Sequence, residues 1–289
     1  MAIALFILGA ALGSFLYVIA LRYDPDRPLW DRRVLGGRSR CEHCGQELSW
    51  FELVPLLSFL VQKGRCRKCE RRISAAYPVV EIAAGALMAG VPAFIFGPGR
   101  WIHAGVSFQT LGWVAAIWTA AFLALFLLSL IDLRLQLIPD ELQVLLAALG
   151  LSLVLLLQDS WVWPLGSFLG GYGALLGLPG NIWSARFAGA LIGAAFLFAL
   201  FLITRGRGMG IGDVKLALGL GLLFGWPDIL LIFLLSFVLG SVYGLFAVLA
   251  RRKPMRSKVP FGPFLALAAA AVFFLGFEVV DFYFRLFNL

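Results

Sequence analysis

Charge is scarce in this chain. Only 14% of its 289 residues are Asp, Glu, Lys or Arg, whereas 61% are apolar. Soluble domains carry about 25% charged residues, so this chain has too few to cover a water-exposed surface. The composition excludes an ordinary soluble globule and predicts a protein whose main solvent is the lipid bilayer.

Apolar stretches of about 20 residues, the length that crosses the hydrocarbon core, predict an all-α polytopic membrane protein with about eight transmembrane helices. The sixth stretch is short and rich in glycine. The first lacks a basic start and an A-x-A site, so we expect it to remain as a membrane span and not as a cleaved signal peptide. The expected helices cover approximately 1–21, 77–97, 111–131, 139–157, 185–204, 213–226, 228–250 and 259–280.

The basic residues lie almost entirely in alternate connections. The net charge is +8, and 21 of the 24 Lys and Arg residues fall in segments 22–76, 132–138, 205–215 and 251–258. The positive-inside rule places these segments in the cytoplasm and both termini outside. Because this placement accounts for the excess charge, we expect no nucleic-acid partner.

One soluble unit interrupts the helical pattern. After a first transmembrane helix over 1–21, segment 22–76 holds all four cysteines and is predicted to be a small cytoplasmic domain, and 77–289 forms the remaining membrane core. The domain has little apolar sequence for a core of its own. Domains this short usually need a metal or disulfides for stability.

The cysteines form two C-x-x-C pairs, which suit one tetrahedral Zn²⁺ site. Disulfides or a redox pair are the alternatives, and a cytoplasmic location disfavours persistent disulfides. His43 lies inside the first pair and is expected to point away from the metal. Four thiolates leave no open coordination position, so the predicted role of the zinc is structural. The expected ligands are Cys41, Cys44, Cys66 and Cys69.

Acidic residues in or beside apolar spans are rare and costly, so each is a candidate functional group. Asp213 follows Gly208, Gly210 and Gly212, which allow a helix or an extended substrate to approach closely. Two carboxyl groups that share a proton activate water in aspartic proteases. If Asp213 is catalytic, we therefore expect a second carboxylate at the same membrane depth.

Asp132 is the expected partner, because it stands at the end of the third span, where the helix dipole disfavours an anion. Asp140 follows a proline at a helix start, where capping is a sufficient explanation. Glu81 is either an interfacial carboxylate or a group that meets a substrate amine. Lys215 is expected to anchor at the interface or to balance Asp213.

These stretches together resemble the type IV prepilin peptidase family. The matching runs include Gly13-Ser14-Phe15-Leu16, the cysteine pairs, Tyr77-Pro78 with Glu81, Ile131-Asp132, Leu137 to Asp140 and Gly208 to Lys215. The sequence departs from the family pattern at Tyr17, where asparagine is expected, and at Glu42, where proline is common.

The resemblance implies an inner-membrane aspartyl endopeptidase that cuts after a glycine in the basic leader of type IV prepilins or type II secretion pseudopilins. It also implies that the two catalytic aspartates of the family correspond to Asp132 and Asp213 of this sequence. It also implies N-methylation of the new terminus with S-adenosylmethionine, although no G-x-G-x-x-G cradle is present.

Two other classes of function are possible. A transporter could use the same aspartates as an ion or proton relay. However, the sequence shows no pair of broken helices at matching positions of two halves, which is typical of such folds. A membrane scaffold that binds zinc without catalysis is the third possibility.

Overall fold

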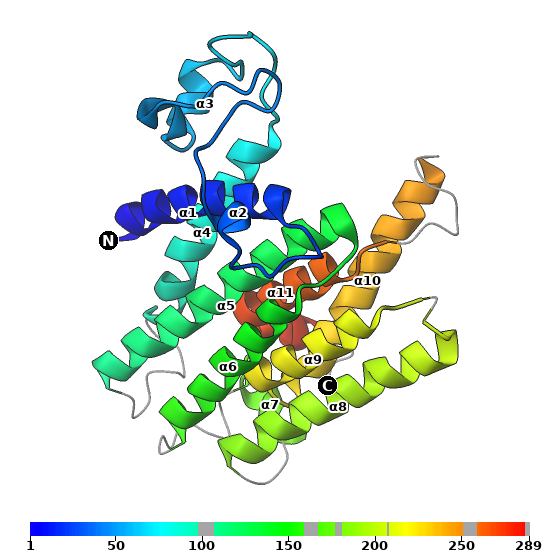
Figure 1. The fold of residues 1–289 in the computed structure, drawn as a ribbon. Coiled ribbons are helices and arrows are strands. Elements are labelled where there is room, and N and C mark those ends of the chain that lie inside the picture. The colour runs from blue at the N-terminus through cyan, green and yellow to red at the C-terminus, as the bar shows by residue number, and fades with distance from the viewer. Residues whose placement is uncertain (98–106, 159–166, 177–180, 207, 251–258, 287–289) are drawn as a thin grey trace. The chain divides into compact units, whose positions relative to one another are not determined.

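The computed structural model describes residues 1–97, 107–158, 167–176, 181–206, 208–250 and 259–286. All the regular elements among them are helical, apart from two isolated antiparallel bridges. The chain divides into two compact units, Met1–Ala93 and Phe94–Leu289 (Figure 1). The basic segment 251–258, which the sequence places in the cytoplasm, lies outside the described residues.

The first unit combines two long helices with the cysteine-bearing segment. Its helices are α1 (Ala2–Arg22), α2 (Arg32–Leu35), a 3₁₀ turn (Trp50–Leu53), α3 (Leu57–Val61) and α4 (Ala76–Ile95), the last of which runs on into the second unit. The expected soluble segment 22–76 therefore shares one compact unit with the apolar helices on either side of it.

Small residues bring α1 and α4 together. A Cβ atom at Gly9 would lie 2.5 Å from the Met88 Cβ, and one at Gly13 would lie 2.6 Å from the Ala84 Cβ. Glycines four residues apart let two apolar helices pack at short distance, as is common in membranes. This packing explains Gly13 physically and places Ser14 close to the start of α4.

The second unit is a bundle of long apolar helices with two shorter ones. It contains α5 (Phe108–Leu135), α6 (Asp140–Leu157), α7 (Gly171–Leu176), α8 (Ile182–Thr204), α9 (Ile211–Phe224), α10 (Asp228–Leu249) and α11 (Gly262–Leu286). Helix α9 packs against α8 and α6, α10 packs against α11, and α5 packs against α11 and α6 (Figure 1).

Helices are present at all eight expected spans, but the helix at the sixth is shorter than a membrane-spanning helix. Among the described residues, seven helices are long and apolar enough to cross a membrane. The remaining one, α9, has only 14 residues and is mostly buried between its neighbours. Helix α5 continues one turn beyond the expected end of the third span, so Asp132 lies in its last turn and is not its last residue.

Glycines allow the close packing of α9. A Cβ at Gly221 would lie 2.4 Å from the Ala190 Cα on α8, and one at Gly150 on α6 would lie 2.7 Å from the Leu222 Cβ on α9. Such contacts between backbones leave no room for side chains. Helix α9, whose first turn carries Asp213, is therefore held near its C-terminal end by close packing against α8 and α6.

We predict that Gly221→Ala destabilises the second unit by about 1–3 kcal/mol, because the added methyl group forces α8 and α9 apart. Unfolding of the purified protein in mixed detergent micelles measures the change. Gly244→Ala on α10 is the matched control, since its Cβ meets nothing within 4 Å. Equal stability of Gly221→Ala and the control would contradict the packing argument.

Candidate active site and cysteine cluster

The second unit brings Asp132 and Asp213 together. Both side chains are buried, with residue exposures of 4% and 7%. Asp132 comes from the last turn of α5 and Asp213 from the first turn of α9. Their carboxylates are close enough to interact electrostatically. The fold thus places a second carboxylate, that of Asp132, near Asp213, as the sequence analysis expected.

Each of the two carboxylates accepts a hydrogen bond from the backbone at the start of a helix. The Asp213 Oδ2 accepts the Gly210 N–H at 3.0 Å, and the Asp132 Oδ2 accepts the Gly262 N–H at 3.0 Å. Backbone N–H groups at helix starts are free to donate and are favourable to anions. Asp213 therefore caps its own helix, while Asp132 is held by the start of α11.

Gly262 is a site residue that the sequence analysis missed. A Cβ there would lie 2.7 Å from the Asp132 Oδ2 and 3.1 Å from the Leu128 Cδ2. Only glycine lets the backbone approach this carboxylate so closely. The signal in the sequence was the Pro260-Phe261-Gly262-Pro263 run at the start of the last apolar span.

The three glycines before Asp213, which the sequence analysis expected to allow close approach, have different environments. Gly210 donates to Asp213, and a Cβ at Gly212 would lie 3.3 Å from the Ile138 Cβ, next to the α5–α6 connection. A Cβ at Gly208 would lie 3.1 Å from the Thr204 Cγ2 at the end of α8. At Gly208 and Gly212 the protein's own chain therefore comes close to the glycine.

Lys215 pairs with Asp140 and not with Asp213. Its Nζ lies 2.8 Å from the Asp140 Oδ1, and both side chains are largely exposed, at 48% and 68%. Asp140 is the first residue of α6, directly after the N-cap Pro139, so its carboxylate lies in the first helical turn, where the sequence placed it. Its carboxylate links α6 to α9 beside the buried pair.

The structure contains a second buried polar cluster, around Asp228, which the sequence analysis did not identify. Asp228, at the start of α10, is fully buried. It accepts hydrogen bonds from the Ser167 hydroxyl and from the Phe168 N–H at 2.9 Å, and it interacts electrostatically with Arg186 on α8. These partners account for a charge in the interior. Asp228 thus explains how residues 167 and 168 are attached to the bundle.

In the first unit the four cysteines form one cluster. Their Sγ atoms all lie within 4.8 Å of one another, and the Cys41 and Cys69 sulfurs are 3.9 Å apart. A tetrahedral zinc with Zn–S bonds of about 2.3 Å separates its sulfurs by about 3.8 Å. The cysteines are free thiols in the structure, and the donor set fits one Zn²⁺ ion. His43 is exposed and is not part of the cluster.

Two similar turns build this cluster. Each C-x-x-C pair is closed by a short antiparallel bridge, Arg40 to Glu47 in the first and Arg65 to Arg72 in the second. In the second turn, the backbone N–H groups of Cys69 and Lys68 lower the pKa of the Cys66 thiol to about 7. A thiol that ionises readily is a better metal ligand.

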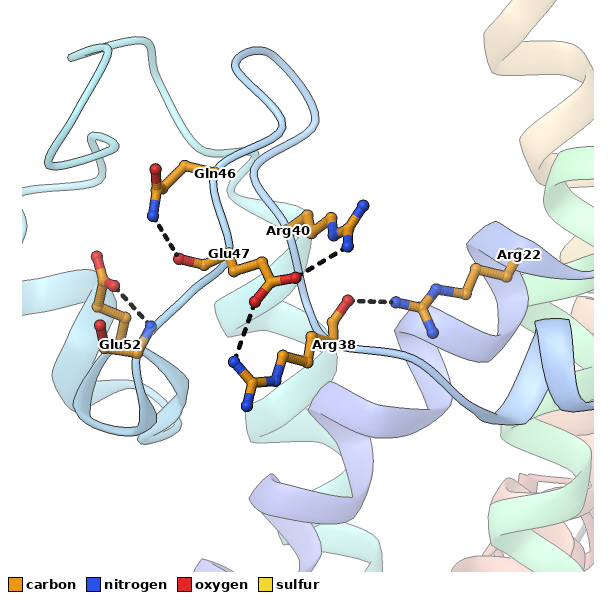
Figure 2. Close-up of polar contacts among 7 residues, drawn as sticks. Arg22, Arg38, Arg40, Gln46, Glu47 and Glu52 are labelled. Carbon is orange, nitrogen blue, oxygen red and sulfur yellow. Dashed lines mark hydrogen bonds and ion pairs between the residues drawn. The ribbon is translucent and has the colours of Figure 1, made fainter.

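Ion pairs join residues within the first turn, and hydrogen bonds from Arg22 attach this turn to the end of α1 (Figure 2). The Glu47 carboxylate accepts hydrogen bonds from Arg38 at 3.0 Å and from Arg40 at 2.9 Å, and these bonds hold its pKa below the usual value. The Arg22 guanidinium donates to the carbonyl oxygens of Arg38, at 3.1 Å, and of Gly36. The last residue of α1 is therefore tied to the cysteine-bearing segment.

We predict one zinc per chain in the purified protein, lost when any of the four cysteines becomes serine. Metal binding supplies folding energy in small modules of this kind, so the segment should lose its fold while the long helices remain. Metal analysis and circular dichroism measure the two effects. His43→Ala is the matched control and should keep its zinc. Protein without zinc whose thiols all titrate in the native state would contradict the prediction.

Comparison with known proteins identifies the family. Residues 7–94 match the Bacterial Peptidase A24 N-terminal domain, and residues 119–245 match the Type IV leader peptidase family. No solved structure matches the chain significantly.

Curated relatives of this chain are named prepilin leader peptidase/N-methyltransferase, and three of them show the extent of the similarity. The one from Burkholderia pseudomallei is 36% identical over 243 residues, which cover 83% of this chain and 67% of the relative. The one from Aeromonas salmonicida is 32% identical, with coverages of 96% and 92%. The one from Bacillus subtilis is 31% identical, with coverages of 98% and 97%. The chain therefore belongs to the type IV leader peptidase family.

Proposed function

We propose that this protein is an intramembrane aspartyl endopeptidase that removes the short basic leader, after a glycine, from type IV prepilins or type II secretion pseudopilins. The observation that carries the proposal is the buried pair of Asp132 and Asp213, which come from two helices and interact electrostatically. The relatives described above are named for leader cleavage, which supports the substrate class.

The chemistry assigned to the pair needs one carboxylate in each protonation state. The ionised carboxylate takes a proton from water, and the protonated one donates a hydrogen bond to the scissile carbonyl. Two neighbouring carboxyl groups favour this shared state, because both cannot easily be charged at once.

The cleaved protein is, in this proposal, then N-methylated at its new terminus with S-adenosylmethionine as the methyl donor. Support comes from the second activity in the relatives' names. The chain acts in the bacterial inner membrane, with the cysteine segment and the aspartates on the cytoplasmic side. The concentration of 21 of its 24 basic residues in alternate connections supports this orientation. Nothing in the relatives' names favours a transporter.

Replacement of either aspartate should stop cleavage. We predict that Asp132→Asn and Asp213→Asn each lower the cleavage rate at least about 1,000-fold with little loss of folded protein, because asparagine keeps the shape but cannot act as a base. A mobility shift of a purified prepilin reports leader loss. Asp140→Asn is the matched control, since it loses only an exposed ion pair worth up to about 1 kcal/mol. An active Asp132→Asn enzyme would overturn the assigned pair and leave Asp140 or Glu81 as the next candidate.

Substitution of Gly262 should displace the Asp132 carboxylate. We predict that Gly262→Ala lowers the cleavage rate about 100-fold, the effect expected when a catalytic group moves by about 1 Å. Gly112→Ala on the same helix as Asp132 is the control, because its Cβ meets nothing within 4 Å. Comparison of the two purified variants in the mobility assay is the test. Full activity of Gly262→Ala would show that the close approach at Asp132 is not needed.

A further inference from the structure

The first unit contains a cavity whose lining residues do not include Asp132 or Asp213. It has a volume of about 430 Å³, within the range of about 300–1,000 Å³ of pockets that hold drug-sized ligands. It lies entirely within residues 14–81. Its walls come from the second half of α1, the start of α4, both cysteine turns and the segment between the two turns.

A buried carboxylate faces this cavity. Glu81 on α4 is 6% exposed and lines the cavity. Its Oε2 accepts the Leu56 N–H at 2.8 Å, and none of the Lys or Arg residues that the structure describes forms an ion pair with it. A buried anion with one hydrogen bond and no cation is unfavourable. A cationic ligand would offset that cost.

The other carboxylates of the cavity are differently placed. Glu42 accepts the Tyr77 hydroxyl at 3.0 Å, and the Glu52 Oε2 accepts the Ser49 N–H at 2.8 Å. Both lie in the cysteine-bearing segment, whereas Glu81 is buried in α4. Glu81 is therefore the acidic group of this cavity best suited to a ligand cation.

The cavity also offers groups for an anion and for an aromatic ring. Arg71 and Arg72, next to the second cysteine turn, line it and are exposed. Phe59 and Tyr77 add aromatic side chains, and Tyr17 packs edge-on against Tyr77 with ring centroids 4.7 Å apart. Nucleobases stack on aromatic side chains of this kind. The lining therefore suits a ligand with a cation, a carboxylate and a base.

We propose that this cavity binds S-adenosylmethionine, with Glu81 facing the cationic part of the donor and Arg71 and Arg72 facing its carboxylate. The proposal rests on the methyl-transfer part of the proposed function. S-adenosylmethionine combines two cationic groups, a sulfonium and an ammonium, with a carboxylate and an adenine, and these match the carboxylate, the arginines and the aromatic rings described above. The residues assigned to the donor all lie in the first unit, whereas Asp132 and Asp213 belong to the second.

The transfer itself requires no other reagent. The deprotonated amine of the cleaved chain attacks the methyl carbon with its lone pair, after its extra proton has passed to water. The bond from carbon to sulfur breaks, and its electrons stay on sulfur as a neutral thioether. The positive charge moves from sulfur to nitrogen, so the Glu81 carboxylate stabilises the cation before and after the step.

Binding of the donor to the full-length protein in lipid nanodiscs tests the proposal directly. We expect Glu81→Gln to weaken S-adenosylmethionine binding, measured by equilibrium dialysis, at least about 10-fold, the equivalent of one lost ion pair. Glu278→Gln removes the same charge from an exposed position on α11 and should leave binding unchanged. Unchanged binding by Glu81→Gln would overturn the proposal.

A second measurement, made on the wild-type protein, tests the proposal even if the Glu81→Gln variant does not fold. Ultraviolet cross-linking of S-adenosylmethionine labelled in its methyl group, followed by peptide mapping, should label only peptides within residues 14–81. Label in the second unit would overturn the proposed site. If that occurs in protein that still methylates a cleaved pilin, the proposed function stands. If the wild-type protein neither binds the donor nor methylates, the methyl-transfer part of the function fails as well.

Discussion

A carboxylate at membrane depth must find hydrogen-bond donors inside the protein, because lipid offers none. The arrangement of the second unit follows from this constraint. Asp213 takes the Gly210 N–H at the start of its own helix, and Asp132 takes the Gly262 N–H at the start of α11. Helix starts are the places where backbone N–H groups are free. The buried acids are therefore found where one helix ends and others begin.

Close packing through small residues holds α9 against its two neighbours, α8 and α6. Helix α9 is short and has no room to shift, because Gly221 meets the backbone of α8 and Gly150 on α6 meets Leu222. The exposed pair of Lys215 and Asp140 adds a link between α6 and α9. In lipid the hydrophobic effect does not drive helices together, so such contacts carry much of the specificity.

The first unit contains a cluster suited to a structural metal and, beside it, a cavity suited to a ligand. Its cysteine cluster fits a closed metal site, and two backbone turns present the four thiols to one point. The cavity beside it is lined by residues of both turns and by α1 and α4. If zinc folds these turns, it also forms one wall of the cavity. Metal binding and ligand binding in this unit are then coupled through the fold.

The sequence alone predicted the long apolar helices and the cysteine cluster, and it singled out Asp132 and Asp213 as candidates, because hydropathy, C-x-x-C spacing and acids in apolar sequence are local signals. It did not reveal that Gly262 supports Asp132, that Lys215 pairs with Asp140, or that Asp228 is buried beside Ser167. These contacts join residues far apart in the chain. Only the packing of helices brings them within hydrogen-bonding distance, and no local pattern encodes which helix ends will meet.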